Sequence, residues 1–221
     1  ISPLAGLTKL TDLNLYATKV TDLTPLKGLT KLQKLNLYMV KAKDWSPLAS
    51  LPELDDLWIQ FSDIKDFSML AKARKMKKLD ADWCHDLSDI SAVSGMPELE
   101  DLDLDSTKVT SLEPIAKNTK LKDLDIGSTK INDLRPLEGL TELEDLDLSS
   151  TEVTSLAPLA KHKKLKYVRL YKTKITDLSP LAASAKEKSL SALYVPKSLE
   201  KAAASLKKDN PDLKVEVDSS K

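Results

Sequence analysis

The sequence predicts an α/β solenoid, a right-handed horseshoe with short parallel strands on its concave side and 3-10 or irregular turns on its convex side. Two further observations accompany a 22-residue period: a fixed order of apolar positions in each period, and a proline at one constant position. A unit of this length buries its apolar face only against its neighbours, so such repeats stack into an array. The period begins at Leu7 and returns at Leu29, Leu51, Met96, Asn118, Leu140 and His162, and a less regular fourth repeat with one extra residue runs from Ala73 to Gly95.

The first half of each repeat predicts a short strand. A Leu-x-Leu pair, such as Leu13 and Leu15, alternates with period two, which indicates a strand with one buried face. The position after the strand holds Val40, Ser62 or Cys84 in three repeats and threonine in the other five. We expect this corner column to face inward, where hydroxyls satisfy buried backbone groups. Its threonines are Thr18, Thr107, Thr129, Thr151 and Thr173.

The second half of each repeat predicts a turn on the outer side. The repeats end on variants of the pattern Asp-Leu-x-Pro-Leu, which is exact at Asp22–Leu26, Asp133–Leu137 and Asp177–Leu181. Proline interrupts regular backbone hydrogen bonding and favours a tight turn. The prolines at this position are Pro3, Pro25, Pro47, Pro114, Pro136, Pro158 and Pro180.

The repeats predict two regions of chain. Residues 1–183 form the array, with eight full repeats of 22 or 23 residues after the tail of a truncated first one. Residues 184–221 are predicted to form a C-terminal capping segment of strand, helix and strand. A cap is expected because the last repeat would otherwise expose its apolar core.

The Asp-Leu-x-Pro-Leu ending in a 22-residue unit, as at Asp22–Leu26 and Asp177–Leu181, resembles the leucine-rich repeats of the bacterial internalin type. The resemblance extends over about residues 1–183. It implies a leucine-rich-repeat horseshoe from a bacterial surface or secreted protein that grips a partner protein with its concave face. The chain departs from that family's usual unit by preferring threonine to asparagine in the corner column.

Aromatic side chains gather at strand positions that are predicted to face outward. Seven of the ten aromatic residues lie there. Exposed aromatic clusters are typical of binding hot spots. The alternative is that aromatic residues simply favour strands, which does not explain why they avoid repeats five to seven. The predicted partner-binding residues are these seven aromatic residues together with one arginine: Tyr16, Tyr38, Trp58, Phe61, Trp83, Tyr167, Arg169 and Tyr171.

Aspartates occupy many of the same outward positions. Neighbouring strands lie about 4.8 Å apart, so carboxylates at equivalent positions repel one another and have raised pKa values. We expect them to attract a partner with a basic patch. Two alternatives are that they keep the sheet soluble, or that they share a calcium ion, although the glycine and glutamate of a calcium loop are absent. The predicted partner-binding aspartates are Asp80, Asp82, Asp103, Asp105, Asp125 and Asp147.

Several function classes find no support. The chain contains two histidines, His85 and His162, and none of the common nucleotide-binding or hydrolase motifs. Its one cysteine, Cys84, falls in the inward corner column and is predicted to be a buried structural thiol. A net charge of zero opposes nucleic-acid binding, and the apolar runs are too short for membrane insertion. We predict no catalytic residue, cofactor or metal site.

The sequence therefore predicts a non-enzymatic protein-binding module, adhesin-like, on the bacterial surface or secreted. One alternative is an intracellular repeat effector or inhibitor that masks a basic partner, since a lone thiol suits a reducing compartment. Another is a structural spacer within a larger surface protein.

Overall fold

The structure, a computed structural model, describes residues 1–218 of the chain. The chain divides into two compact units, unit 1 at Ile1–Val109 and unit 2 at Thr110–Lys221. The last three residues of the predicted capping segment lie outside the described residues.

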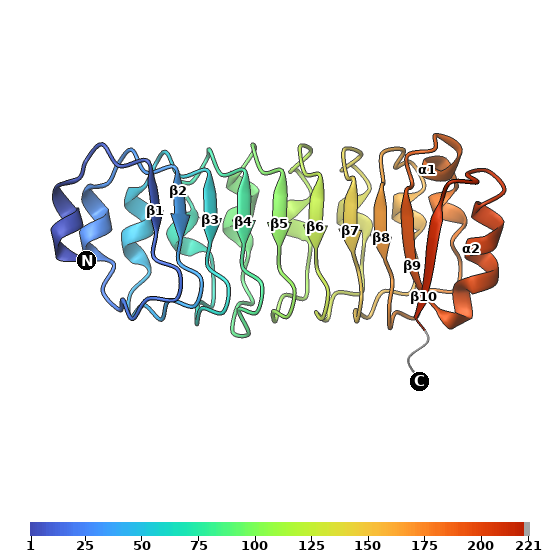
Figure 1. The fold of residues 1–221 in the computed structure, drawn as a ribbon, viewed down its shortest axis with the longest axis horizontal. Coiled ribbons are helices and arrows are strands. Elements are labelled where there is room, and N and C mark those ends of the chain that lie inside the picture. The colour runs from blue at the N-terminus through green and yellow to red at the C-terminus, as the bar shows by residue number, and fades with distance from the viewer. Residues whose placement is uncertain (219–221) are drawn as a thin grey trace. The chain divides into compact units, whose positions relative to one another are not determined.

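Unit 1 contains parallel strands that follow one another in sequence order (Figure 1). The register aligns equivalent residues of successive repeats, so that Leu13 pairs with Leu35 and Leu57 with Leu79. Identical repeat positions therefore form straight columns across the sheet. The strands are β1 (Asp12–Asn14), β2 (Lys34–Asn36), β3 (Asp56–Trp58), β4 (Lys78–Asp80) and β5 (Asp101–Asp103).

Unit 2 continues the same pattern and ends in longer strands. Leu124 pairs with Leu146 and Leu146 with Val168, again one repeat apart. Two short α-helices accompany the last strands, α1 (Ala182–Lys186) and α2 (Glu200–Leu206). The sequence reading included a helix between the last strands but not α1. The strands are β6 (Asp123–Asp125), β7 (Asp145–Asp147), β8 (Tyr167–Arg169), β9 (Ala192–Pro196) and β10 (Lys214–Asp218).

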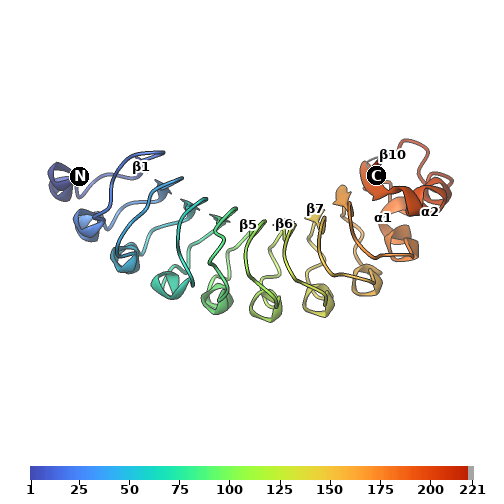
Figure 2. The ribbon, with the colours of Figure 1, turned by 90° about the horizontal axis from the view of Figure 1, so that it is seen from below.

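Short 3-10 helices lie opposite the strands in each unit (Figure 2). Proline stands in the first turn of most of them, where its missing N–H breaks no helical hydrogen bond. The aspartate of the Asp-Leu-x-Pro-Leu pattern fixes the entry to the helix: Asp22 Oδ1 accepts the N–H of Thr24 at 2.9 Å. The 3-10 helices are η1 (Ser2–Gly6), η2 (Thr24–Gly28), η3 (Ser46–Ser50), η4 (Ser68–Leu70), η5 (Ser91–Gly95), η6 (Glu113–Ile115), η7 (Arg135–Leu137), η8 (Ala157–Leu159), η9 (Ser179–Leu181) and η10 (Lys197–Leu199).

The core lies between strands and 3-10 helices, and the corner column closes it. The buried Thr107 and Thr129 hydroxyls donate to the carbonyls of Leu104 and Ile126 at 2.7 and 2.6 Å. In unit 1 the buried Cys84 thiol serves the same purpose and donates to the Ile59 carbonyl at 3.1 Å. The leucine-rich-repeat solenoid is thus confirmed. The corner column is buried in six of its eight repeats, whereas Thr18 is exposed and Thr173 is half-buried.

Candidate functional site

A continuous row of aromatic rings runs along the strand ends of unit 1. The Tyr16 and Tyr38 rings stack at a centroid distance of 4.7 Å, and those of Phe61 and Trp83 stack at 5.5 Å. An edge contact of 5.3 Å joins Tyr38 to Phe61, and one of 5.4 Å joins Trp83 to His85. These spacings are close to the strand separation of about 4.8 Å, so four successive repeats contribute one ring each, and the fourth repeat adds His85 after Trp83. We call these five residues the aromatic ladder.

Rings of the ladder are exposed to solvent, and two of its residues, Phe61 and Trp83, have a strained backbone. Tyr16 is 55% exposed and Trp83 is 42% exposed. The residue that precedes the corner column has a positive φ in every repeat, and this value is 57° at both Phe61 and Trp83. Left-handed backbone costs a residue with a Cβ roughly 1–2 kcal/mol. Three later repeats place a small serine at this position, at Ser106, Ser128 and Ser150.

The left-handed position before the corner column holds different residues in different repeats, and the stability of the fold does not explain the difference. Repeats two to four hold Met39, Phe61 and Trp83, with φ values of 58°, 57° and 57°. Large side chains in this conformation are outliers. Strain of this kind gathers at functional sites, because folding alone would favour the less strained residue. The position therefore marks Met39, Phe61 and Trp83 as candidates for a role beyond folding.

The last residue of most strands has a structural role that the sequence pattern did not predict. Asp103 Oδ1 accepts the N–H of Asp105 at 2.9 Å, and Asp147 Oδ1 accepts that of Ser149 at 2.8 Å. Each side chain thereby closes an Asx turn at the strand end. The same hydrogen bond, two residues forward, forms in six repeats. Its acceptors are Asn14, Asn36, Asp80, Asp103, Asp125 and Asp147.

Opposite charges partly neutralise the first strand position in unit 1. Lys34 lies 3.3 Å from Asp56, and Lys78 lies 3.6 Å from Asp101. These pairs join successive repeats across the sheet. The acidic character of unit 1 is therefore concentrated at the other predicted positions, which we call the acidic patch. The acidic patch consists of Asp80, Asp82, Asp103 and Asp105.

Burial and mutual repulsion perturb the acidic patch. The register places Asp80 directly beside Asp103. Burial raises the pKa of Asp103 to about 7, and the carboxylates of Asp80, Asp82 and Asp105 add to this effect. Burial likewise raises the pKa of Asp80 to about 6, although hydrogen bonds from Asp82 and Gln60 oppose the shift. A cationic group at this patch would favour the ionised form of both carboxyls.

The predicted site residues of unit 2 form a separate group. Arg169 Nε lies 3.8 Å from a carboxylate oxygen of Asp147, and its guanidinium lies 5.4 Å from the Tyr194 ring centroid. The Tyr171 hydroxyl donates to Glu216 at 3.2 Å, and burial raises its pKa to about 12. Tyr167 is 39% exposed on β8. Asp125 pairs in register with Asp147.

Two residues of unit 1 differ from expectation. Trp58, predicted as an anchor, is half-buried on β3 between Asn36 and Asp80 and takes no part in the aromatic ladder. His85, which the sequence reading set aside, caps the ladder against Trp83 and places Nδ1 3.0 Å from the Ser106 carbonyl. The sequence feature that could have indicated a role for His85 is its position two residues after Trp83, which has a left-handed backbone.

Residues 1–218 contain no group of three or more His, Cys, Asp or Glu side chains arranged to hold a metal ion. Over the same residues, no helix has the length and apolar character needed to cross a membrane.

The fold has clear counterparts among known proteins. Residues 119–161 match a family model described as leucine-rich repeats in two copies. No curated protein matches the chain by sequence. A plant peptide hormone receptor, RGFR1 in complex with RGF2, shares the fold alone, with 14% identity over 87% of this chain and 38% of the receptor and a TM-score of 0.62. The chain is thus a leucine-rich-repeat protein. This fold is typical of protein–protein interaction modules and of non-enzymatic scaffolds.

Two bacterial structures specify the class further. An internalin (InlF) from Listeria monocytogenes is 33% identical, with a TM-score of 0.86 over 97% of this chain and 62% of its own. Internalin C2 from the same species is 29% identical, with a TM-score of 0.76 over 80% of this chain and 79% of its own. The chain is an internalin-like bacterial leucine-rich-repeat protein, and it spans less than two thirds of that InlF chain.

Proposed function

We propose that the chain is a protein-recognition module that binds a partner protein through the strand face of its repeats. The observation that carries this proposal is the aromatic ladder, in which four successive repeats of unit 1 hold rings in contact at the surface. Tyrosine and tryptophan at the centre of such surfaces dominate binding free energies. The internalin-like class supports the same role and implies a surface or secreted protein.

The acidic patch supports a proposal about the chemistry of the partner. Asp80 and Asp82 belong to the repeat that also supplies Trp83, and Asp103 pairs in register with Asp80. A partner that offers apolar side chains to the rings and lysine or arginine to the carboxylates would match both features. We therefore propose a partner with a basic patch, with Tyr167, Arg169 and Tyr171 as a second contact group in unit 2.

Replacement of Trp83 by serine should abolish most of the binding while leaving the fold intact. Serine occupies the equivalent position at Ser106, so the variant is compatible with the left-handed backbone. Loss of an aromatic anchor of this kind weakens binding by about 2 kcal/mol, or roughly 30-fold in Kd. The measurement is capture of partners from host and bacterial lysates at low and high salt, followed by Kd determination with the purified partner.

A matched control separates the effect of losing the aromatic ring from the effect of changing the left-handed turn. Lys172→Ser makes the same change at the equivalent left-handed position of unit 2, and it should leave Kd unchanged within about twofold. Equal binding by wild type and Trp83→Ser would remove the ladder from the site. The absence of any captured partner from either lysate would favour the spacer function instead.

A further inference from the structure

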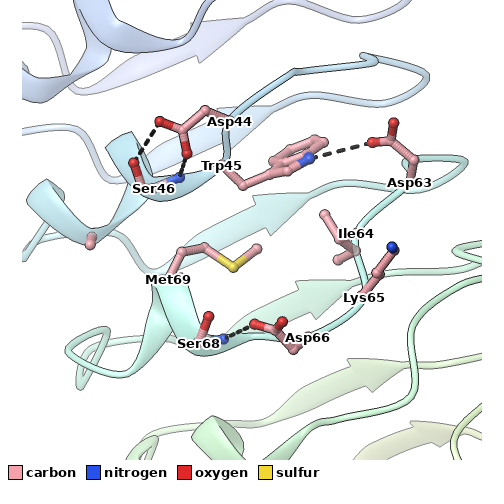
Figure 3. Close-up of a pocket in the computed structure, with 10 residues that line it drawn as sticks. Asp44, Trp45, Ser46, Asp63, Ile64, Lys65, Asp66, Ser68 and Met69 are labelled. Carbon is pink, nitrogen blue, oxygen red and sulfur yellow. Dashed lines mark hydrogen bonds between the residues drawn. The ribbon is translucent and has the colours of Figure 1, made fainter.

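A hollow of about 550 Å³ opens on unit 1, between the turn that leads into η3 and the turn that leads into η4 (Figure 3). Pockets for small ligands have volumes of about 300–1,000 Å³, so the size suits one small organic group. None of the residues of the aromatic ladder or the acidic patch lines it. Its principal lining side chains are Asp44, Trp45, Asp63, Ile64, Asp66 and Met69.

The hollow is built from departures from the chain's own repeat pattern. Trp45 stands where other repeats have a leucine such as Leu23 or Leu112, each 1% exposed. This position predicts a buried core residue, but the indole is only half-buried, whereas Phe67 at the equivalent position of the next repeat is 1% exposed. Met69 stands where most repeats have the turn proline. Because both of these exceptions to the repeat pattern line the same hollow, they indicate a local function beyond folding.

The indole ring has a fixed orientation in this hollow. Its Nε1–H points to Asp63 Oδ1 at 3.4 Å, a long hydrogen bond. Figure 3 shows the ring across the hollow from Met69, with Ile64 beside them on the side of Asp63 and Lys65. Ile64 and Met69 are 3% and 9% exposed, so they form an apolar floor below the ring.

The rim of the hollow is acidic. The Asp44 carboxylate accepts the Ser46 N–H and hydroxyl, each at 2.8 Å, and Asp66 accepts the Ser68 N–H at 2.8 Å. These hydrogen bonds lower the pKa of both carboxyls, so both are ionised at neutral pH. The lining includes three carboxylates and one ammonium, that of Lys65. The hollow therefore favours a cation over an anion.

We infer that this hollow is a second binding site, specific for an ammonium or guanidinium group carried on a short apolar stem. The stem would pack on Ile64 and Met69, and the cation would lie between the indole of Trp45 and the rim carboxylates. Tryptophan is the aromatic side chain that binds cations best. The inference is independent of the proposed partner site, because it uses no residue of that site.

The test is a titration of the three tryptophan indole N–H signals by ¹⁵N NMR, using n-butylammonium, n-butylguanidinium and neutral n-butanol. The Trp45→Leu variant, which restores the leucine of other repeats, assigns the Trp45 signal by its loss. We expect the Trp45 signal to shift in a saturable way with both cations and not with butanol. Equal shifts with butanol, equal shifts at Trp58 and Trp83, or no shift would each overturn the inference.

Variants and a second ligand sharpen the result. Asp63→Asn keeps an acceptor for the indole and removes one charge, so it should weaken cation binding about fivefold, whereas Asp133→Asn in unit 2 should not. Nα-acetyl-lysine methylamide distinguishes the sources of the cation. Binding at least as tight as that of butylammonium identifies a lysine side chain of another protein as the ligand, and weaker binding identifies a free amine. Equal affinity of wild type and Asp63→Asn would contradict an electrostatic site.

Discussion

The Asp103→Asn variant should be more stable than the wild type at about pH 8, by about 2 kcal/mol in the free energy of unfolding. Asn14 and Asn36 form the same Asx turn at this position, so the amide can accept the Asp105 N–H as the carboxylate does. The change removes a carboxyl whose pKa rises from 3.8 to about 7 on burial beside Asp80, Asp82 and Asp105. Urea unfolding followed by circular dichroism measures the difference.

The gain in stability of Asp103→Asn should depend on pH. A carboxyl with a raised pKa in the folded state contributes stability below its unfolded pKa of 3.8, and this contribution is lost as the pH rises through about 7. Asparagine does not titrate, so the advantage of the variant should be small near pH 4 and largest above pH 7. The control is Asp147→Asn, which removes a carboxylate that lies near Arg169 and should give no gain. A gain that is independent of pH would contradict repulsion as its cause.

The same variant connects stability with the proposed function. If a basic partner neutralises the acidic patch, Asp103→Asn should bind it more weakly while it unfolds less readily. An opposition of this kind between stability and binding is common where a site is destabilised for its function. We expect the same opposition at the left-handed Phe61 and Trp83 in this unit, since serine occupies their position in later repeats.

The fold could be predicted because one leucine-rich pattern recurs in register. Leu35, Leu57 and Leu79 occupy one column in the structure, and the period alone fixes that column. The same column argument placed Tyr16 and Tyr38 at the strand ends, where their rings stack. Periodicity identifies which residues are equivalent, and in a parallel sheet equivalent residues are neighbours.

The remaining features depend on side-chain geometry that periodicity does not carry. The Asx turn of Asp103 requires a backbone N–H two residues ahead, in a turn whose shape the pattern does not describe. Periodicity places Trp45 at a position that is apolar in every repeat, but its indole is half-buried with Nε1–H toward Asp63, whereas Phe67 at the equivalent position is buried. Trp58 is the last residue of β3, whereas Phe61, three residues later, supplies the ring of this repeat to the aromatic ladder, so Trp58 lies outside the ladder.

The second large effect is expected at His162. This residue takes the place of leucine at the start of a repeat and is fully buried, at 0% exposure. Among the described residues, neither ring nitrogen has a hydrogen-bond partner. Burial lowers the pKa of the imidazole below 6.5, although the carbonyls of Leu159, Leu140 and Leu137 partly oppose this. His162→Leu should therefore stabilise the chain by about 1–3 kcal/mol at pH 7, measured by urea unfolding.

The advantage of His162→Leu should grow as the pH falls. Below pH 6.5 the unfolded chain binds a proton at His162 that the folded chain does not, so wild-type stability declines by at most about 1.4 kcal/mol per pH unit until the folded pKa is reached. His162→Asn separates titration from packing, because Asn118 is buried at the equivalent position and asparagine does not titrate. Both variants should show the same pH profile relative to wild type, although their absolute stabilities differ. Parallel profiles for wild type and both variants would exclude His162 as a source of acid sensitivity in unit 2.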